Sequence, residues 1–165
     1  MSHFYKTMTS PVGTLTLVAS DKGLAAILWP LDDPKRLKLP VLTRGNDHPV
    51  LLQAVKELGE YFVGKRTHFT VELDFAGTDF QKRVWKALLE IPFGQTRSYG
   101  DIARKLGKPS AMRAVGAANG RNPISIIAPC HRVIGANGAL TGFVGGLEAK
   151  KKLLALEAAR RFAKK

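Results

Sequence analysis

The sequence predicts an α+β protein in which a small N-terminal sheet-plus-helix module precedes a mainly helical C-terminal domain. Two observations lead to this fold class. Up to Leu73 the chain alternates short apolar runs with turn residues, as in a small sheet, and from Asp79 onward its apolar residues recur mainly at helical spacing. The stretch 75–78 separates the two patterns. We therefore expect two domains, residues 1–76 and 77–165.

The N-terminal module is expected to contain a sheet and one helix. The runs 4–8, 13–19 and 24–29 are typical of strands, with turns at 11–13 and 21–23. The segment 30–46 is rich in proline and charge and is predicted to be a loop. Residues 49–62 place apolar side chains at helical spacing, and 69–73 return to the alternation of a strand.

The C-terminal domain begins with a helix that Asp79 is expected to cap. The apolar side of this helix is formed by Phe80, Val84, Trp85, Leu88 and Leu89. Two short helices follow. Ser98 with Asp101 resembles a capping box, and Gly107 is expected to end the first helix. Ser110 is expected to cap the second, residues 111–119, so the pair has the outline of a helix-turn-helix.

The second helix of this pair consists mostly of alanine and glycine, with Arg113 as its one long cation. Such a helix can bring its backbone close to a groove of DNA but has few side chains that could read base edges. It is therefore typical of binding without strong sequence preference. The alternative is that its small residues, Ala114 and Ala117 among them, simply allow close packing inside the domain.

The composition favours a polyanionic partner. The chain has 26 Lys and Arg against 13 Asp and Glu, a formal net charge of +13, and nucleic acid is the leading candidate. The alternative is a solubilising surface, because part of the excess lies at 150–152 and 160–165, which would fit a solvated helix face and tail. No run is long and apolar enough to cross a bilayer, so we expect a soluble, cytoplasmic protein without a membrane partner.

Cys130 is the only cysteine, so any sulfur chemistry must take place there. A lone cysteine beside a histidine is a candidate nucleophile, although most such residues are small buried hydrophobes. The apolar run 124–128 is predicted to be a strand that delivers the thiol to the end of a buried element, where Pro129 stops strand pairing.

His131 is the natural base for this thiol, but consecutive residues of a strand point to opposite faces. Either the chain bends at this position or a water relays the proton. A third polar group should hold the imidazole, and Glu157 at the margin of the last helix's apolar stripe is a candidate. Pairing of Glu157 with Arg161 along that helix is the alternative, and the spacing alone does not separate the two.

Several short motifs occur in a fixed order along the chain. They are Phe80-Gln81 with Trp85, Tyr99-Gly100, Arg113-Ala-Val-Gly116, Asn122-Pro123, Pro129-Cys130-His131-Arg132-Val133-Ile134-Gly135, and Gly145-Gly146 followed by Leu156-Glu157. This order resembles that of the O6-alkylguanine-DNA alkyltransferases, the methylated-DNA–protein-cysteine methyltransferases. The resemblance covers residues 80–157 and implies a ribonuclease H-like N-terminal module.

The resemblance implies direct repair of DNA. Such a protein flips an alkylated guanine out of the duplex and transfers the alkyl group to its own cysteine, here Cys130, once and irreversibly. His131 would act as a water-mediated base, Glu157 would orient the imidazole, and Tyr99 would donate a proton or hydrogen bond to the leaving guanine. Asn122 would brace the turn before the active-site segment, although an ordinary Asn-Pro turn explains it equally well.

The resemblance also implies the DNA-binding surface and the alkyl pocket. Arg113 would replace the extruded base in the stack, while the alanine-rich helix lies in the minor groove. The residues expected at the DNA are Arg113, Ala114, Ala117 and Ser98, and those expected at the pocket are Phe143, Val144, Gly145 and Gly146. Many relatives carry Tyr and Ser at 143 and 144. Phe143 and Val144 have no polar side-chain group for a hydrogen bond to the base, which leaves contacts from the backbone of this loop. Their apolar side chains would favour bulky alkyl groups.

No cofactor is expected, because the substrate carbon passes directly to sulfur. A metal is not expected either, since His3, His48 and His68 lack the spacing of ligands. The expected partner is double-stranded DNA that contains O6-alkylguanine, bound by a protein that is a monomer when free. Cooperative assembly on DNA stays open.

Three other functions compete with alkyl transfer. Alkyltransferase-like proteins bind the lesion but lack the acceptor cysteine, which Cys130 argues against. A cysteine hydrolase would need an oxyanion loop that is not evident. A basic helix-turn-helix regulator should prefer a defined sequence, whereas Arg113 on an alanine surface predicts little preference.

Overall fold

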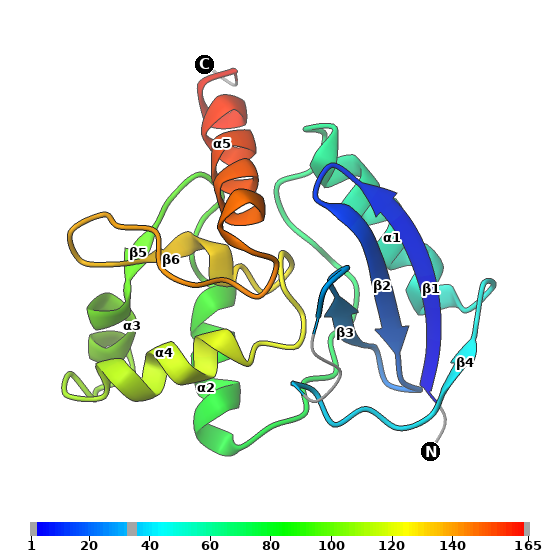
Figure 1. Cartoon of the computed structure of the whole chain (residues 1–165), viewed down its shortest axis with the longest axis horizontal. Coiled ribbons are helices and arrows are strands. Elements are labelled where there is room, and N and C mark those ends of the chain that lie inside the picture. The colour runs from blue at the N-terminus through cyan, green and yellow to red at the C-terminus, as the bar shows by residue number, and fades with distance from the viewer. Residues whose placement is uncertain (1–2, 33–35, 164–165) are drawn as a thin grey trace. The chain divides into compact units, whose positions relative to one another are not determined.

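The structure is a computed structural model that describes residues 3–32 and 36–163, with side chains described up to residue 159. The chain divides into two compact units, Met1–Ala76 and Gly77–Lys165. Strands dominate the first unit and helices the second, which confirms the predicted fold class (Figure 1). Within the described ranges, no helix combines the length and the apolar character needed to span a bilayer.

In the residues that the structure describes, the N-terminal unit is a four-stranded sheet with one helix packed against it. Its elements are β1 (His3–Ser10), β2 (Gly13–Ala19), β3 (Leu24–Leu28), β4 (Leu42–Arg44) and α1 (Pro49–Phe62). The sheet order is β3-β2-β1-β4, and only the pair of β1 and β4 is parallel. The buried apolar side of α1 consists of Leu51, Ala54, Leu58 and Tyr61. The first three predicted strands and the helix are therefore confirmed, with small differences at their ends.

Two predictions for this unit are wrong. The segment 30–46 is not all loop, because Leu42–Arg44 pairs with β1 as β4; three residues are too few to show a strand's alternation. The predicted strand at 69–73 is reduced to one bridge between Leu24 and Leu73. The buried carboxylate of Glu57 accepts the backbone N–H groups of Thr70 and Val71 at 2.9 and 3.2 Å, so these donors are not available to a neighbouring strand.

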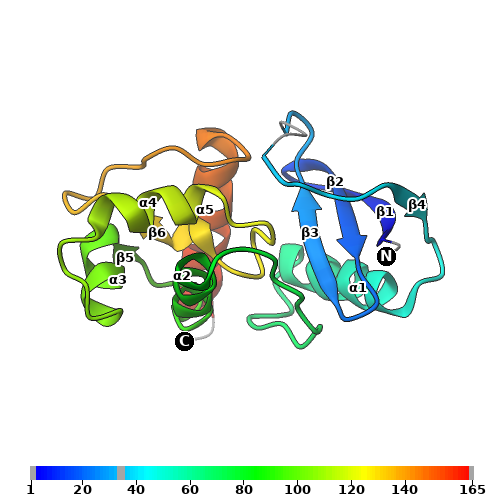
Figure 2. The same ribbon diagram turned by 90° about the horizontal axis from the view of Figure 1, so that it is seen from below.

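In the C-terminal unit, helices surround a short pair of parallel strands (Figure 2). Its elements are α2 (Asp79–Leu89), β5 (Arg97–Ser98), α3 (Tyr99–Lys105), α4 (Met112–Gly120), the 3₁₀ turn η1 (Cys130–Arg132), β6 (Val133–Ile134) and α5 (Leu147–Ala163). The buried indole of Trp85 on α2 donates its Nε1–H to the Ala118 carbonyl on α4 at 2.9 Å. The turn η1 contacts both α2 and α5, so it lies inside this unit.

The helix ends follow local chemistry, with two corrections. Thr78, rather than the predicted Asp79, caps α2, because its hydroxyl reaches the Gln81 N–H and the Gln81 side chain reaches back. The capping box of Ser98 and Asp101 at α3 is confirmed. The prediction that Ser110 caps the next helix is wrong: Ala111 occupies the cap of α4 without a side-chain hydrogen bond.

Candidate active site

Cys130 lies in a buried turn. Residues 122–133 are buried without interruption, and Cys130 itself is 2% exposed. The Ala128 N–H donates to the Ile124 carbonyl at 3.0 Å, and the Cys130 N–H donates to the Ala128 carbonyl at 2.7 Å. The predicted strand at 124–128 is therefore wrong. Ile126 has a φ of 72°, which interrupts an extended run, and the chain bends so that Cys130 and His131 share the turn η1.

Asn122 braces this turn through its side-chain amide. Its Nδ2 donates to the Ala128 carbonyl at 2.8 Å, and its Oδ1 accepts the Ile124 N–H at 3.0 Å. Both backbone groups belong to buried residues, where water does not replace a missing partner, and the Ala128 carbonyl accepts the Cys130 N–H as well. Asn119, near the end of α4, approaches the Cys130 carbonyl at the long distance of 3.5 Å. The segment between α4 and the thiol is thus fixed by side chains as well as by its backbone.

His131, Arg132 and Glu157 form one buried network. The His131 Nε2 lies 2.7 Å from Glu157 Oε2. Arg132 donates to both oxygens of the same carboxylate, from Nε at 2.8 Å and from Nη2 at 3.0 Å, and its Nη1 donates to the Ile91 carbonyl at 2.7 Å. The Glu157 carboxylate therefore binds two residues of η1 and does not lie on the exposed surface of α5. The alternative partner, Arg161, has a side chain outside the described residues.

The charges of this network determine which nitrogen of His131 can accept a proton. Burial alone raises the pKa of Glu157, but the hydrogen bonds and charges of His131 and Arg132 outweigh it and lower the pKa to about 2. Burial lowers the pKa of His131, and Glu157 only partly offsets this. At neutral pH the carboxylate is ionised and accepts only, so Nε2 of a neutral imidazole carries the hydrogen and Nδ1 keeps its lone pair.

The Nδ1 atom of His131 is buried and has no hydrogen-bond partner among the residues that the structure describes. A buried nitrogen of this kind normally has a partner. The lone pair of His131 Nδ1 is therefore available to act as a base, and it lies in the same turn as Cys130.

Lys150 is a second buried charge on α5. It is fully buried, and its Nζ donates to the Val133 carbonyl at 2.8 Å and to the Thr141 carbonyl at 3.4 Å. Burial lowers the pKa of Lys150, while the negative charge of a Cys130 thiolate acts in the opposite direction. The alternative of a solvated helix face at 150–152 does not hold for this residue. Lys150 precedes Glu157 by two helical turns, so both side chains lie on the buried side of α5.

Tyr99 is brought to this region by the ladder of β5 and β6. Ser98 pairs with Ile134, so the first residue of α3 follows directly from the strand beside the active-site segment. The Tyr99 ring lies near Gly116 of α4: a Cβ at that glycine would be 3.8 Å from the ring. The Tyr99 hydroxyl shares a short hydrogen bond with the hydroxyl of Thr141.

The predicted pocket residues Phe143, Val144, Gly145 and Gly146 lie on the loop between β6 and α5. The Gly146 N–H donates to the Phe143 carbonyl at 2.9 Å, and Gly146 has a φ of 91°. This left-handed turn leads directly into α5, because the Lys150 N–H donates to the Gly146 carbonyl. Lys150 connects this loop to β6, the strand after the turn of Cys130, because its Nζ donates to the carbonyls of both Thr141 and Val133.

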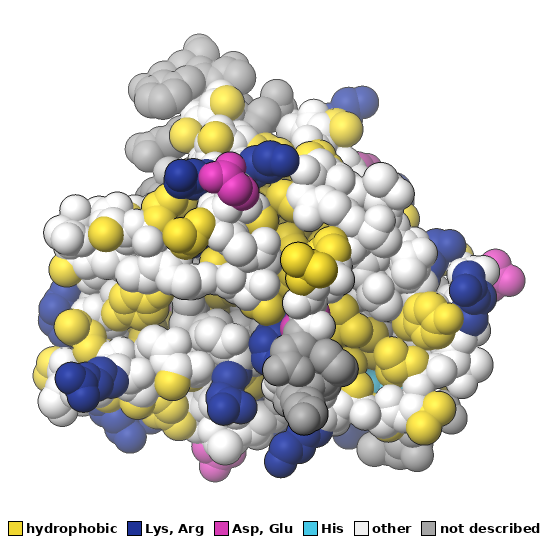
Figure 3. All heavy atoms as spheres, viewed as in Figure 1, with side chains coloured by type: hydrophobic (Ala, Val, Ile, Leu, Met, Phe, Trp, Pro, Cys, Tyr) yellow, Lys and Arg dark blue, Asp and Glu magenta, His cyan; other side chains and the backbone are white. Residues whose placement is uncertain are grey.

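The predicted DNA-binding residues on α4 lie on its exposed side. Arg113, Ala114 and Ala117 are exposed, whereas Val115 and Ala118 are buried. Ser98, at the start of α3, is half-buried and uses its hydroxyl to cap that helix. Several Lys and Arg side chains are visible at the lower left of Figure 3, where Figure 1 shows α3 and α4, and others are spread over the rest of this face. The exposed side of α4 thus carries the cation of Arg113 among small side chains.

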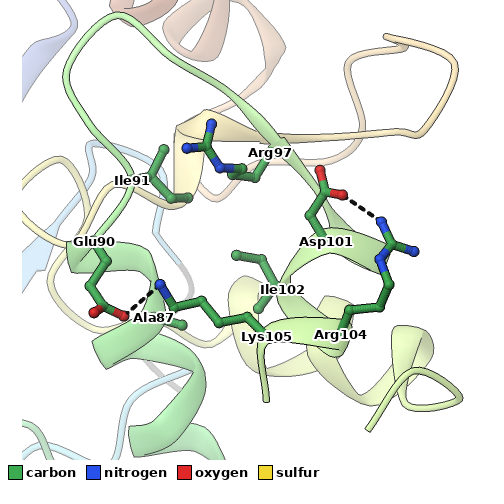
Figure 4. A pocket seen from close by; sticks show the side chains of 8 residues that line it. All are labelled: Ala87, Glu90, Ile91, Arg97, Asp101, Ile102, Arg104 and Lys105. Carbon is green, nitrogen blue, oxygen red and sulfur yellow. Dashed lines mark hydrogen bonds and ion pairs between the residues drawn. The ribbon is translucent and has the colours of Figure 1, made fainter. Parts of the chain in front are cut away.

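A separate pocket of about 380 Å³ lies between α2 and α3 (Figure 4). None of the predicted catalytic side chains lines it. Four of its charged groups form two ion pairs, Lys105 with Glu90 at 2.9 Å and Arg104 with Asp101. The fifth, Arg97, donates to the side chain of Gln95. In the part of the chain that the structure describes, no group of three or more His, Cys, Asp or Glu could hold a metal ion.

Comparison with known families accounts for both units. The model of the 6-O-methylguanine DNA methyltransferase DNA-binding domain matches residues 79–159, and that of the ribonuclease-like domain of the same methyltransferase matches residues 3–75. The chain belongs to the 6-O-methylguanine DNA methyltransferase family. This confirms the resemblance found in the motifs.

Relatives from this family match nearly the whole chain. The methylated-DNA–protein-cysteine methyltransferase of Mycobacterium tuberculosis is 53% identical over 94% of this chain and 93% of its own length. That of Methanosarcina acetivorans is 47% identical over 93% of this chain and 97% of its own length. The crystal structure of Mycobacterium tuberculosis OGT in complex with DNA covers 95% of this chain and 94% of its own, with a TM-score of 0.86 and 52% identity.

The structure thus brings together Cys130, His131 and Glu157, with Asn122 on the same segment. Sequence reasoning missed other side chains that contact this centre: Asn119, Arg132, Thr141 and Lys150. One signal for Lys150 was available, because it lies seven residues before Glu157 on one helix. For Thr141 no signal exists in the sequence, because its partner Tyr99 is 42 residues away.

Proposed function

We propose that this chain repairs O6-alkylguanine in double-stranded DNA by transferring the alkyl group to Cys130. The observation that carries this proposal is the network of Arg132, Glu157 and His131, which presents an imidazole lone pair in the turn of the only cysteine. The thiolate is the reactive form of cysteine, and a base within the same buried turn supports its formation. The relatives named methylated-DNA–protein-cysteine methyltransferase support the same reaction.

The transfer is a single displacement. His131 takes the proton of the thiol, directly or through a water, and the sulfur attacks the alkyl carbon. The new S–C bond forms as the bond between that carbon and guanine O6 breaks, and the electron pair passes to the guanine. The proton that left the thiol is returned to the guanine, so the products are a thioether on Cys130 and an unmodified base. Sulfur in a thioether is a poor leaving group, and each molecule therefore acts once.

Tyr99 assists the departure of the guanine. A base that leaves as an anion in a dry pocket is unstable, and a hydroxyl placed beside it stabilises the developing charge. Support for this role comes from the position of Tyr99 at the start of α3, next to the strand that follows Cys130. Its hydroxyl faces the loop that carries the proposed pocket residues.

Base flipping brings the lesion to the thiol, because a stacked base does not expose its O6 substituent. Arg113 fills the gap in the stack, and the small side chains of Ala114 and Ala117 allow α4 to lie in the minor groove. Ser98 lies at the neighbouring end of α3 and completes this surface. The exposure of these α4 side chains supports the assignment. The C-terminal unit, residues 77–165, then carries both DNA binding and alkyl transfer.

The loop residues Phe143, Val144, Gly145 and Gly146 form the wall of the alkyl pocket. Their side chains offer no hydrogen-bonding groups to the base, so recognition there uses the backbone. Apolar side chains at 143 and 144 favour bulky alkyl groups. The free protein acts as a cytoplasmic monomer.

Stoichiometry tests the proposal. The protein is mixed with an excess of a duplex that carries one O6-methylguanine, and restored guanine is measured by chromatography of digested DNA. Alkyl transfer predicts a plateau at one guanine per protein molecule. Tight binding without restored guanine would instead support the lesion-binding alternative, and continuing turnover would contradict an irreversible transfer.

A further inference from the structure

The hydroxyl groups of Tyr99 and Thr141 share a hydrogen bond. Tyr99 begins α3, and Thr141 belongs to the loop between β6 and α5. Both side chains are half-buried, and the bond joins the start of α3 to this loop.

The backbone of Thr141 is held in place by a buried cation. The Lys150 Nζ donates to the Thr141 carbonyl at 3.4 Å and to the Val133 carbonyl at 2.8 Å. Val133 follows the active-site turn directly and pairs with Arg97 in the short ladder. Lys150 thus fixes the backbone of Thr141 relative to β6, the strand that pairs with β5 just before Tyr99.

A hydroxyl has a single hydrogen, so only one member of this pair can donate to the other. If Tyr99 donates to the leaving guanine, its own hydrogen is used there. Thr141 must then be the donor and Tyr99 the acceptor of the bond between them. Donation to the phenolic oxygen also polarises the phenolic O–H group and so strengthens the hydrogen bond that this group donates to the guanine.

We propose that Thr141 is a positioning residue for alkyl transfer: its hydroxyl donates to the Tyr99 oxygen and thereby directs the phenolic hydrogen to the leaving guanine. This inference rests on the proposed function, because it needs Tyr99 to act on a guanine. It adds a residue that does not touch the alkyl group and that acts only through Tyr99. The role requires a hydroxyl at position 141 and does not require the methyl group of threonine.

Two substitutions separate this role from simple support of the loop. Thr141→Val keeps the shape and removes the hydroxyl, whereas Thr141→Ser keeps the hydroxyl. Single-turnover transfer from duplex O6-methylguanine is measured for both. We expect Thr141→Val to slow transfer about tenfold, the effect of one hydrogen bond to a charged group, and Thr141→Ser to restore most of the rate.

Alkylation of Cys130 by iodoacetamide serves as the second readout, because the departing iodide needs no hydrogen-bond donor. Thr141→Val should react with iodoacetamide at the wild-type rate. Equal slowing in both assays would show that the substitution disturbs Cys130 itself, which would overturn the inference. So would wild-type transfer by Thr141→Val.

A double-mutant cycle with Tyr99→Phe completes the test. Once the phenolic hydroxyl is absent, Thr141→Val should cause no further loss of transfer, and an additional tenfold loss would contradict a role through Tyr99. Transfer by the wild-type protein separates a failure of the proposed function from a failure of the role of Thr141. If it transfers no methyl group, the proposed function fails. If it transfers and the cycle is additive, only the role of Thr141 fails.

Discussion

Replacing Arg132 tests whether the buried network is held together as described. Arg132→Met preserves much of the side-chain volume but removes three hydrogen bonds, two to Glu157 at 2.8 and 3.0 Å and one to the Ile91 carbonyl at 2.7 Å. It leaves the buried carboxylate of Glu157 without the charge of Arg132, and with the neutral imidazole of His131 as its remaining partner in the network. Breaking a buried ion pair from one side typically costs about 3–5 kcal/mol of folding free energy, and we expect a loss in this range.

The assay is urea unfolding of the whole chain at pH 7, followed by circular dichroism. Arg104→Met is the matched control, because it makes the same substitution in an exposed pair of the same unit; the Arg104 side chain is 63% exposed. Exposed pairs contribute about 0–1 kcal/mol, so the control should lose little. The reasoning is refuted if Arg132→Met costs no more than Arg104→Met.

The pH dependence of Glu157 gives a second measure of the same network. Its pKa of about 2 lies below the ordinary value of 4.5, so its contribution to stability is complete above pH 4.5 and is lost as the pH falls through about 2. The difference corresponds to about 3 kcal/mol. A ¹³C carboxyl titration by NMR should place the wild-type midpoint near 2 and the Arg132→Met midpoint higher. A wild-type midpoint at the ordinary value would contradict the assigned charges.

Three further predictions concern the reaction itself. Cys130→Ala should abolish methyl transfer and leave the affinity for duplex DNA unchanged in a gel-shift titration; lost binding would mean that the thiol also supports the DNA surface. Arg113→Ala should slow repair of duplex DNA at least about tenfold, while its reaction with free O6-benzylguanine stays at the wild-type rate; equal losses would remove Arg113 from base flipping. Lys150→Met should slow the reaction of Cys130 with iodoacetamide about tenfold at pH 7, because a nearby ammonium favours the thiolate; an unchanged rate would limit Lys150 to holding the loop.

The sequence predicted the helices and the active-site residues better than it predicted the segment 124–128, which precedes Cys130. Helical periodicity located α1 and α2, and Ser98 with Asp101 marked the start of α3 because capping depends on residues close in sequence. The run 124–128 looked like a strand because apolar content cannot reveal a left-handed residue such as Ile126.

Contacts between distant residues were the other limit of the sequence. Thr70 and Val71 do not form the predicted strand, because their N–H groups donate to the carboxylate of Glu57, more than ten residues away in the sequence. Lys150 looked like part of a solvated run because its backbone acceptors, Val133 and Thr141, are defined only by the fold. The motifs located Cys130, His131 and Glu157, but the side chains that position them had to be seen in three dimensions.

The central claim is that Cys130 itself receives the alkyl group. The most direct measurement is the mass of the intact protein after reaction with an equimolar duplex that contains one O6-methylguanine, followed by peptide mapping. We expect the gain of a single methyl group on the peptide that contains Cys130, with unmodified guanine left in the DNA. A tightly bound protein of unchanged mass, or a methyl group on another residue, would contradict it.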